Sequence, residues 1–257
     1  MTVLRSRSFD RLQVTVASDR SALGRLAGQR AAHHLNAAIS STGSARIILA
    51  SAPSQNELLS ALLESSIDWS RVTIFHMDEY VGLDADHPAT FRCYQRHKVL
   101  SHIAPATFHG IRGEVDDSAA ECARYAGLLR EAPIDLVCLG IGENGHLAYN
   151  DPPVADFNDP NWVKPVQLDE LCRQQQVNDG CFPKVEDVPT RALTLTIPAL
   201  LSARTIIGAV PGQRKAIAVR DTLVGPVATT CPASILRTHH NAALYLDTDS
   251  AALLPEQ

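Results

Sequence analysis

Residues 134–146 read IDLVCLGIGENGH, a strongly apolar run that passes directly into a glycine-rich polar turn. The run at 134–139 predicts a strand that is buried on both faces. Similar runs predict further strands at residues 47–50, 72–75, 192–197, 205–210 and 243–246. Apolar residues spaced by three and four predict helices at residues 19–41, 54–63, 90–100, 119–129, 215–223 and 233–236. This alternation predicts a doubly wound, three-layer α/β sandwich with a mostly parallel sheet.

The composition excludes several broad classes of protein. The chain has 257 residues, of which 45% are hydrophobic and 20% are charged, and its formal net charge is −5. These proportions are typical of a globular protein, and we expect one domain over residues 1–257. A mildly acidic chain is a poor candidate for binding nucleic acid or anionic membranes. The sequence also shows neither a secretory signal nor an apolar stretch of about 18 residues, so we expect a cytoplasmic protein.

The cysteines are expected to be free thiols. None of the six forms a Cys-x-x-Cys pair, and the paired spacing of a zinc site is therefore missing. In a chain of this length they do not indicate a disulfide framework either. We expect no metal site. The cysteines are Cys93, Cys122, Cys138, Cys172, Cys181 and Cys231.

One segment interrupts the alternation of strands and helices. Residues 152–189 contain six prolines and are too long for a simple connection. Long irregular insertions often act as lids over a site. The alternative is a surface excursion with a short helix at residues 168–176, and the sequence leaves both interpretations open.

Because ligands of such sheets bind beyond the carboxyl ends of the strands, the segments that follow the strands are the first candidates for chemistry. After the strand at 47–50 the chain reads SAPSQNE from Ser51 to Glu57. The unpaired N–H groups of a helix N-terminus could hold a phosphate there, with Ser51, Ser54 and Gln55 as added donors. Ser54 and Glu57 also fit a capping box, which needs no ligand. The two interpretations are compatible.

The strand at 72–75 is followed by two adjacent carboxylates, Asp78 and Glu79. Neighbouring side chains of an extended chain point to opposite faces. One carboxylate could therefore face the ligand crevice as a general base while the other makes a structural bond. A solvated acidic turn remains the alternative.

The glycine-rich turn after residue 139 has the spacing of a dinucleotide-binding loop. Gly140, Gly142 and Gly145 satisfy G-x-G-x-x-G, but prolines 152 and 153 end any following helix within two turns. The regular helix that such a loop requires is missing, so we do not expect NAD. His146 could transfer protons near neutral pH, and Asp151 could orient its ring. A purely structural histidine is the alternative.

Four motifs together resemble one known family. Residues 77–83 read MDEYVGL and residues 140–152 read GIGENGHLAYNDP. The likeness continues through VPTRALT at 188–194 and GQRKA at 212–216. The chain is similar, over most of residues 47–246, to the glucosamine-6-phosphate deaminase/isomerase family, which is related to the 6-phosphogluconolactonases.

The resemblance implies a Rossmann-like fold and conversion of glucosamine 6-phosphate to fructose 6-phosphate and ammonia. It places the proton-transferring carboxylate at Asp78 and the ring-opening histidine at His146. Asp151 supports the histidine, and Asn144 is a further polar partner. The implied partner is a small phosphosugar, with no metal and no organic cofactor. Substrate- and phosphate-binding positions are expected at Ser51, Ala52, Ser54, Gln55, Glu79, Gly145, Arg173 and Lys215.

The chain departs from the family pattern at several of these positions. Its phosphate loop lacks the usual glycine, Asp151 stands for a glutamate, and Asn144 stands where many relatives have an aspartate. Arg173 is the candidate for the arginine of the family's lid. Two other functions therefore stay open at this point, namely hydrolysis of a sugar-acid lactone by water activated at His146 and non-catalytic sensing of a phosphosugar. The sequence also leaves a homo-oligomer open.

Overall fold

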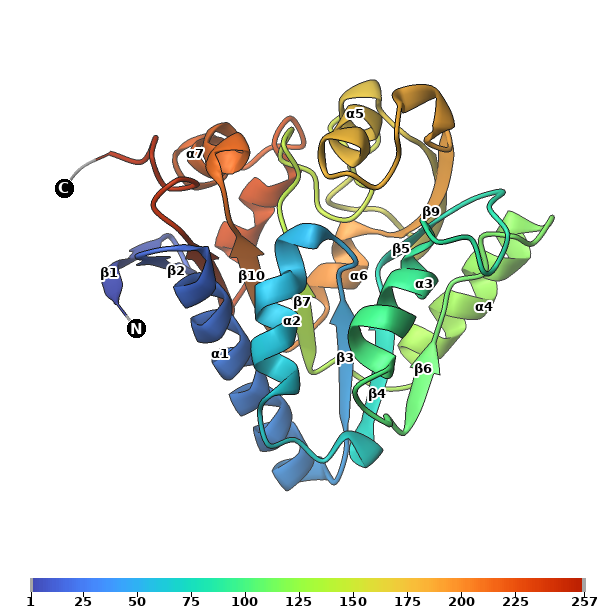
Figure 1. Ribbon diagram of the computed structural model, residues 1–257, viewed down its shortest axis with the longest axis horizontal. Helices are drawn as coiled ribbons and strands as arrows, with labels where there is room; N and C mark the ends of the chain where they lie inside the picture. The colour runs from blue at the N-terminus through green and yellow to red at the C-terminus, as the bar shows by residue number, and fades with distance from the viewer. Residues whose placement is uncertain (1, 256–257) are drawn as a thin grey trace.

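A parallel sheet forms the centre of the molecule. The structure is a computed structural model that describes residues 2–255. Within these residues the main sheet has eight strands (Figure 1). The first strand is antiparallel to the second, and all other neighbours are parallel. In spatial order the strands are β1 (Val3–Phe9), β2 (Leu12–Ala17), β11 (Ala242–Leu246), β10 (Thr205–Val210), β7 (Leu136–Leu139), β3 (Ala45–Leu49), β4 (Val72–His76) and β6 (Thr107–His109).

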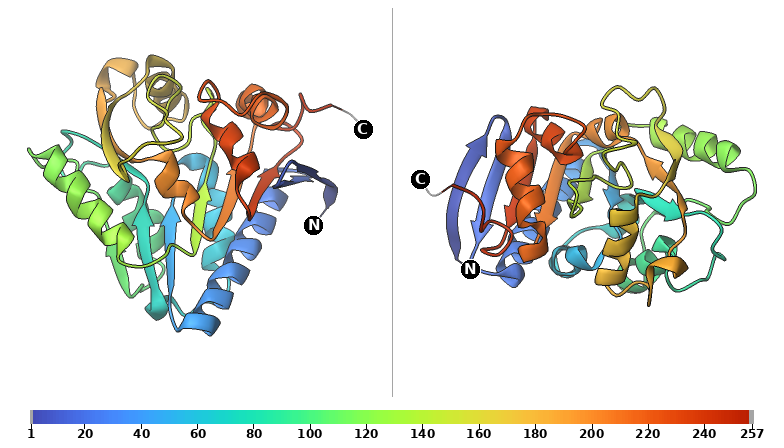
Figure 2. Two further views of the ribbon diagram at one scale, coloured as in Figure 1. Left: turned by 180° about the vertical axis from the view of Figure 1, so that it is seen from behind. Right: turned by 90° about the horizontal axis from the view of Figure 1, so that it is seen from above.

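Helices cover both faces of this sheet, as the alternation of apolar runs predicts. One face carries α1 (Arg20–Thr42), α2 (Asn56–Leu63) and α3 (Phe91–Gln95), which continues as a π-helical turn at Arg96–Leu100. The opposite face carries α4 (Ser118–Arg130), α6 (Ile197–Leu201) and α7 (Ala216–Val224) (Figures 1 and 2). The predicted three-layer sandwich is therefore confirmed. Short 3-10 turns lie at Pro53–Gln55, Trp69–Arg71, Val185–Asp187, Gln213–Lys215 and Pro232–Thr238.

A second, smaller sheet lies above the carboxyl ends of the main strands. It is antiparallel and contains β5 (Asp78–Tyr80), β9 (Arg191–Leu195) and β8 (Val163–Gln167). The prediction that residues 192–197 join the main sheet was wrong. β9 is apolar and buried, but its partners are β5 and β8, and an apolar run alone does not say which sheet a strand joins. β8 and α5 (Glu170–Asn178) belong to the insertion at residues 152–189, which sits over the sheet edge (Figure 2).

The sequence analysis missed the N-terminal hairpin of β1 and β2. β2 alternates buried Leu12, Val14 and Val16 with the exposed Gln13 and the half-buried Thr15, a period-2 pattern that identifies a half-buried strand. The turn between the strands uses Asp10 with φ of 52°. None of the helices in residues 2–255 combines the length and the apolar character that crossing a bilayer requires.

The ends of two helices show where local signals succeed and fail. Asp19 caps α1 by accepting from the N–H of Ala22 at 2.8 Å, and Gly43 with φ of 84° ends it. The capping box predicted at Ser54 and Glu57 does not form, because α2 begins at Asn56 with no side-chain cap. Glu57 instead pairs with Arg20 of α1, Nε to Oε1 at 2.7 Å.

The strand order reverses direction beside β3. From β3 the chain adds β4 and β6 on one side, then returns to place β7 on the other side. The loops that follow β3 and β7 consequently diverge to opposite faces and leave a crevice between them. The glycine-rich turn after β7 and the segment from Ser51 to Gln55 after β3 flank this crevice.

The contact between α1 and α2 yields a test of the fold. A Cβ at Gly28 would lie 2.6 Å from the Cβ of Ala61 and 2.7 Å from the carbonyl oxygen of Leu58. We expect Gly28→Ala to lower the free energy of unfolding in urea by about 1–3 kcal/mol through overpacking. Gly127→Ala in α4 is the control, because no atom lies within 4 Å of the added Cβ, and it should stabilise by about 0.5–1 kcal/mol. Equal effects of the two changes would contradict the close packing of α1 on α2.

Candidate active site

Segments that are distant in the sequence converge on one cavity at the crevice between β3 and β7. The cavity has a volume of about 510 Å³ when it is counted out to its open mouth. Asp78 and His146 both line it, although they are 68 positions apart in the sequence. Lys215, from the segment after β10, lines the same cavity as Asp78 and His146. The other polar side chains of the lining are Ser51, Ser54, Gln55, Tyr149, Gln175 and Gln176.

His146 is held by a carboxylate and an amide. Its Nδ1 lies 2.8 Å from Oδ1 of Asp151, which is 1% exposed. Asn144 Nδ2 donates to the same oxygen at 2.9 Å, and Asn144 Oδ1 accepts from the backbone N–H of His146 at 3.1 Å. Burial raises the pKa of Asp151, but the contacts with His146 and Asn144 outweigh it and leave the pKa below its ordinary value. The shorter side chain of Asp151 thus still reaches the imidazole.

The turn around His146 depends on glycines at two positions. A Cβ at Gly142 would lie 2.2 Å from the imidazole Cε1 of His146, so only glycine leaves room for the ring. Gly145 has φ of 84°, and a Cβ there would lie 2.7 Å from Sγ of Cys231. Ala148 also has a positive φ, 51°, and it lines the cavity. The glycines therefore make room for the histidine and its turn, whereas Gly145, predicted as a binding residue, does not line the cavity.

Asp78 reaches the cavity from β5. Its backbone lies opposite Thr194 of β9 in the small antiparallel sheet, which fixes the direction of the side chain. The residue is buried, at 7% exposure, yet it lines the cavity. Burial raises the pKa of the Asp78 carboxyl well above its ordinary value, and the neighbouring Glu79 carboxylate raises it further. A carboxyl group with a raised pKa is a stronger proton acceptor once it is ionised.

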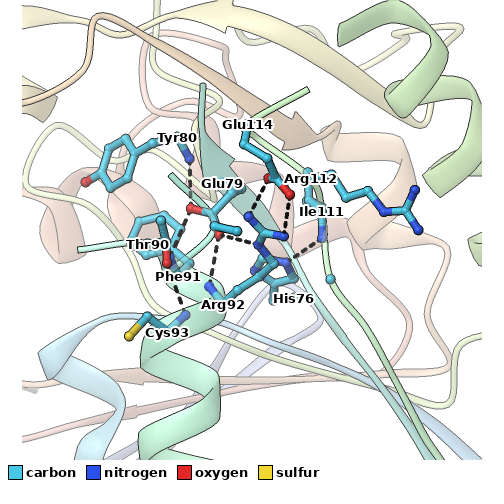
Figure 3. Close-up of polar contacts among 12 residues, drawn as sticks. His76, Glu79, Tyr80, Thr90, Phe91, Arg92, Cys93, Ile111, Arg112 and Glu114 are labelled. Carbon is cyan, nitrogen blue, oxygen red and sulfur yellow. Dashed lines mark hydrogen bonds and ion pairs between the residues drawn. The ribbon is translucent and has the colours of Figure 1, made fainter. Parts of the chain in front are cut away.

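Glu79 points the other way and has a structural role. Its Oε1 accepts from the N–H groups of Tyr80 and Phe91 at 3.0 Å, and its Oε2 accepts from the N–H of Arg92 at 2.9 Å. Figure 3 shows Arg92 between Glu79 and Glu114, with Glu79 joining β5 to the start of α3. Burial raises the pKa of Glu79 to about 7 in spite of these bonds. The prediction of Glu79 as a substrate-binding residue is corrected, because its carboxylate is fully buried and lies outside the cavity.

The segment after β3 is fixed by bonds to two other elements. Ser51 Oγ accepts from Nε2 of Gln95 at 2.9 Å, and Gln55 Nε2 donates to the carbonyl oxygen of Ala209 at 3.0 Å. Ser51, Ala52, Ser54 and Gln55 all line the cavity next to the N-terminus of α2. The N–H groups of a helix N-terminus favour an anion there.

Lys215 is the cation in the lining of this cavity. It lies in the 3-10 turn that precedes α7 and is 7% exposed. Burial lowers the pKa of its ammonium group, while Asp179 and Glu143 act in the opposite direction. A buried ammonium that faces a cavity is suited to an anionic ligand, because the ligand would replace the lost hydration.

The insertion contributes residues that the sequence analysis did not identify. Arg173 does not reach the cavity, because its guanidinium donates to the carbonyl oxygens of Val185 and Val188 within the insertion. This corrects the prediction that Arg173 binds substrate. Gln175 and Gln176 of α5 line the cavity instead. The signal in the sequence is the spacing of Cys172, Gln175 and Gln176, which places three residues on one face of a helix.

One cluster has the residue types of a metal site. His146, Asp151 and Cys172 each offer a ligand atom, and these atoms lie within 4.8 Å of one another. Nδ1 of His146 and Oδ1 of Asp151 are 2.8 Å apart, as in an ion pair, although their relative orientation does not meet the angle of a hydrogen bond. We therefore interpret the cluster as a proton-transfer arrangement.

Solved structures with this fold include enzymes of two activities. A monomeric glucosamine-6-phosphate deaminase superposes with a TM-score of 0.86 at 29% identity, covering 93% of this chain and 99% of that one. A 6-phosphogluconolactonase from Shewanella baltica superposes with a TM-score of 0.76 at 20% identity, covering 94% of this chain and 100% of that one. The second likeness concerns the fold alone.

Sequence comparison finds relatives that align with this chain over most of their length. Glucosamine-6-phosphate deaminases from Listeria innocua and Streptococcus pneumoniae are 38% and 35% identical over 206 and 212 residues. The aligned segments cover 80% and 82% of this chain, and 86% and 88% of the relatives. The model of the glucosamine-6-phosphate isomerase/6-phosphogluconolactonase family matches residues 18–245. The resemblance predicted from the motifs is confirmed, and the chain belongs to this family.

Proposed function

We propose that this protein converts glucosamine 6-phosphate and water to fructose 6-phosphate and ammonia. The observation that carries the proposal is that Asp78, His146 and Lys215 line one cavity. An acid, an imidazole and a cation thus surround one cavity that opens to solvent. The names of the relatives from Listeria and Streptococcus support the same reaction.

In the first step His146 opens the sugar ring. Because Nδ1 of His146 faces Asp151, Nε2 is the nitrogen available to the substrate. It takes the proton of the anomeric hydroxyl and returns a proton to the ring oxygen, which breaks the bond between C1 and that oxygen. Asp151 stabilises the imidazolium that exists between these transfers, and Asn144 fixes the position of Asp151.

In the second step Asp78 moves a proton along the open chain. Its carboxylate removes the proton at C2 while a proton of the C2 ammonium group passes to the oxygen on C1, which gives an enol-type intermediate. The carboxyl group then delivers its proton to C1, and C2 carries the nitrogen as an iminium. Water adds to C2 and gives one proton to the nitrogen, the C–N bond breaks, and the remaining hydroxyl proton leaves with the nitrogen as ammonium while the ketone forms at C2. Each well-placed proton transfer contributes roughly 10²- to 10⁴-fold to the rate.

The phosphate is proposed to bind between Lys215 and the segment from Ser51 to Gln55. There the ammonium group supplies charge, and the N-terminus of α2 supplies N–H donors. We further propose that the insertion at residues 152–189 opens and closes over the bound sugar as part of one domain. A cytoplasmic location, where phosphosugars are metabolised, agrees with this assignment.

The chemistry is tested first by removing the two proton-transfer groups. We expect Asp78→Asn and His146→Gln each to lower kcat for ammonia release from glucosamine 6-phosphate by at least about 10²-fold, with an unchanged circular dichroism spectrum. The exposed Asp84→Asn and His33→Gln are matched controls and should stay within twofold of the parent protein. Near-normal release by either site variant would contradict the assigned roles. Acid release from 6-phosphogluconolactone, assayed in parallel, would favour the lactonase alternative.

A second prediction concerns Lys215. The change Lys215→Met keeps most of the side-chain length but removes the charge, so we expect KM for glucosamine 6-phosphate to rise by about tenfold or more. The rise should be larger than any change in kcat, because the phosphate is held but does not react. The exposed Lys98→Met serves as the control. A KM that stays at the parent value would remove Lys215 from the phosphate site.

A third prediction follows from the environment of Asp78. The base must be ionised, so kcat/KM should rise with pH, and this limb should lie above the ordinary pKa range of an aspartate because burial and Glu79 raise the pKa. Glu79→Gln removes the neighbouring charge and should shift the limb to lower pH, since a like charge disfavours ionisation. Asp84→Asn should leave it in place. A limb that moves upward or stays fixed in Glu79→Gln would show that Glu79 does not influence Asp78.

A further inference from the structure

Helix α5 buries a polar face. Its buried residues are Cys172, Gln175 and Gln176, spaced by three and four along the helix. The apolar Leu171 of the same helix is 69% exposed. Burying an amide without a hydrogen-bond partner costs free energy, so each buried glutamine requires a partner in the working protein.

Gln175 and Cys172 have their partners within the chain. Gln175 Oε1 accepts from the N–H of Glu143 at 2.8 Å, and its Nε2 lies 3.4 Å from Oδ2 of Asp179. Cys172 lies against Asp151, and its sulfur is within 4.8 Å of the ligand atoms of Asp151 and His146. Both residues therefore connect α5 to the rest of the site.

Gln176 is different, because its side-chain amide makes no hydrogen bond within residues 2–255 and stays accessible in the lining of the cavity. The residue is 8% exposed and lines the cavity. Among residues 2–255 its side-chain amide has no hydrogen-bond partner, although its backbone carbonyl accepts from the N–H of Cys181. We propose that Gln176 binds the C3 or C4 hydroxyl of the phosphosugar, an inference that rests on the function proposed above.

The direction of α5 determines which part of the substrate meets Gln176. Cys172 marks the end of the helix beside His146, where the reacting carbons bind. Asp179, just beyond the other end, pairs with Arg214 at 2.8 Å, next to the phosphate-binding Lys215. Gln176 is four residues from Cys172 and three from Asp179, or about 6 Å and 4.5 Å along the helix axis. It therefore lies between the reacting carbons and the phosphate, at the level of the C3 and C4 hydroxyls.

An uncharged amide suits a hydroxyl better than a phosphate. The amide group donates two hydrogen bonds and accepts others, and a hydroxyl group can take either role. A site built to bind a hydroxyl rejects an analogue that lacks it, because its own buried polar group then stays unpaired. Gln176 is thus a specificity-determining residue that identifies the position of a hydroxyl on the substrate.

The experiment combines a variant with substrate analogues. Gln176→Met keeps the size and the helix propensity of the side chain but removes its hydrogen-bonding groups. We expect kcat/KM for glucosamine 6-phosphate to fall about tenfold, which corresponds to the loss of one hydrogen bond of about 1.4 kcal/mol. With the 3-deoxy or the 4-deoxy analogue, whichever lacks the contacted hydroxyl, the parent protein should show a similar loss and the variant no further loss. The inhibition constant of inorganic phosphate should stay within twofold.

The control and the results that would contradict the assignment are as follows. Gln174→Met, on the exposed side of the same helix, is the matched control and should stay within twofold of the parent protein. Losses that add independently for both analogues, or weaker inhibition by phosphate in Gln176→Met, would overturn the hydroxyl assignment. Gln176→Asn supplies a second variant if Gln176→Met melts at a lower temperature than the parent, and it should show the same non-additive loss. An inactive parent protein would instead overturn the proposed function itself.

Discussion

The contact between Nδ1 of His146 and Oδ1 of Asp151 is the interaction on which the site depends. It directs Nδ1 of the imidazole toward Asp151 and leaves Nε2 as the other ring nitrogen of a residue that lines the cavity. Gly142 makes this position sterically accessible, because any Cβ there would overlap the ring. Asn144 then holds the carboxylate from its other side. A departure from the family pattern that shortens the carboxylate is thus accommodated by the local geometry.

Burial sets the electrostatics of the other two groups. Asp78 and Lys215 are both less than a tenth exposed, and neither ionised form is well hydrated. Burial therefore raises the pKa of the acid and lowers the pKa of the ammonium. A negative charge bound beside Lys215 would stabilise its ammonium group and oppose the lowering of its pKa, whereas the raised pKa of Asp78 makes its ionised form a stronger proton acceptor. The insertion contributes Gln175 and Gln176 of α5 to the lining of the same cavity.

The sequence was sufficient for the layers of the fold and for the central pair of catalytic candidates. Apolar runs identified the parallel strands β3, β4, β7, β10 and β11 but missed β2 and β6. The polar residues that follow the identified strands converge because carboxyl ends of parallel strands share one edge. The small antiparallel sheet was not identified, since the pattern of β9 is equally suited to either sheet.

The direction in which individual side chains point was the other feature that the sequence alone could not predict. The local pattern did not say which of Asp78 and Glu79 faces the crevice, and only the family resemblance favoured Asp78; the pairing of β5 with β9 places Asp78 in the cavity and Glu79 against α3. Arg173 was a reasonable anion-binding candidate by charge, but its bonds to carbonyl oxygens hold the insertion together. The buried glutamines of α5 carried a helical spacing that only the burial of the helix makes meaningful.

The most direct test of the whole account is a crystal structure of the complex with the open-chain amino alcohol obtained by reducing glucosamine 6-phosphate at C1. The account predicts the phosphate on Nζ of Lys215, a carboxylate oxygen of Asp78 within about 3.5 Å of C1 or C2, and Nε2 of His146 on the C5 hydroxyl. A carbon chain that runs away from Asp78 and His146, or a phosphate bound elsewhere, would contradict it.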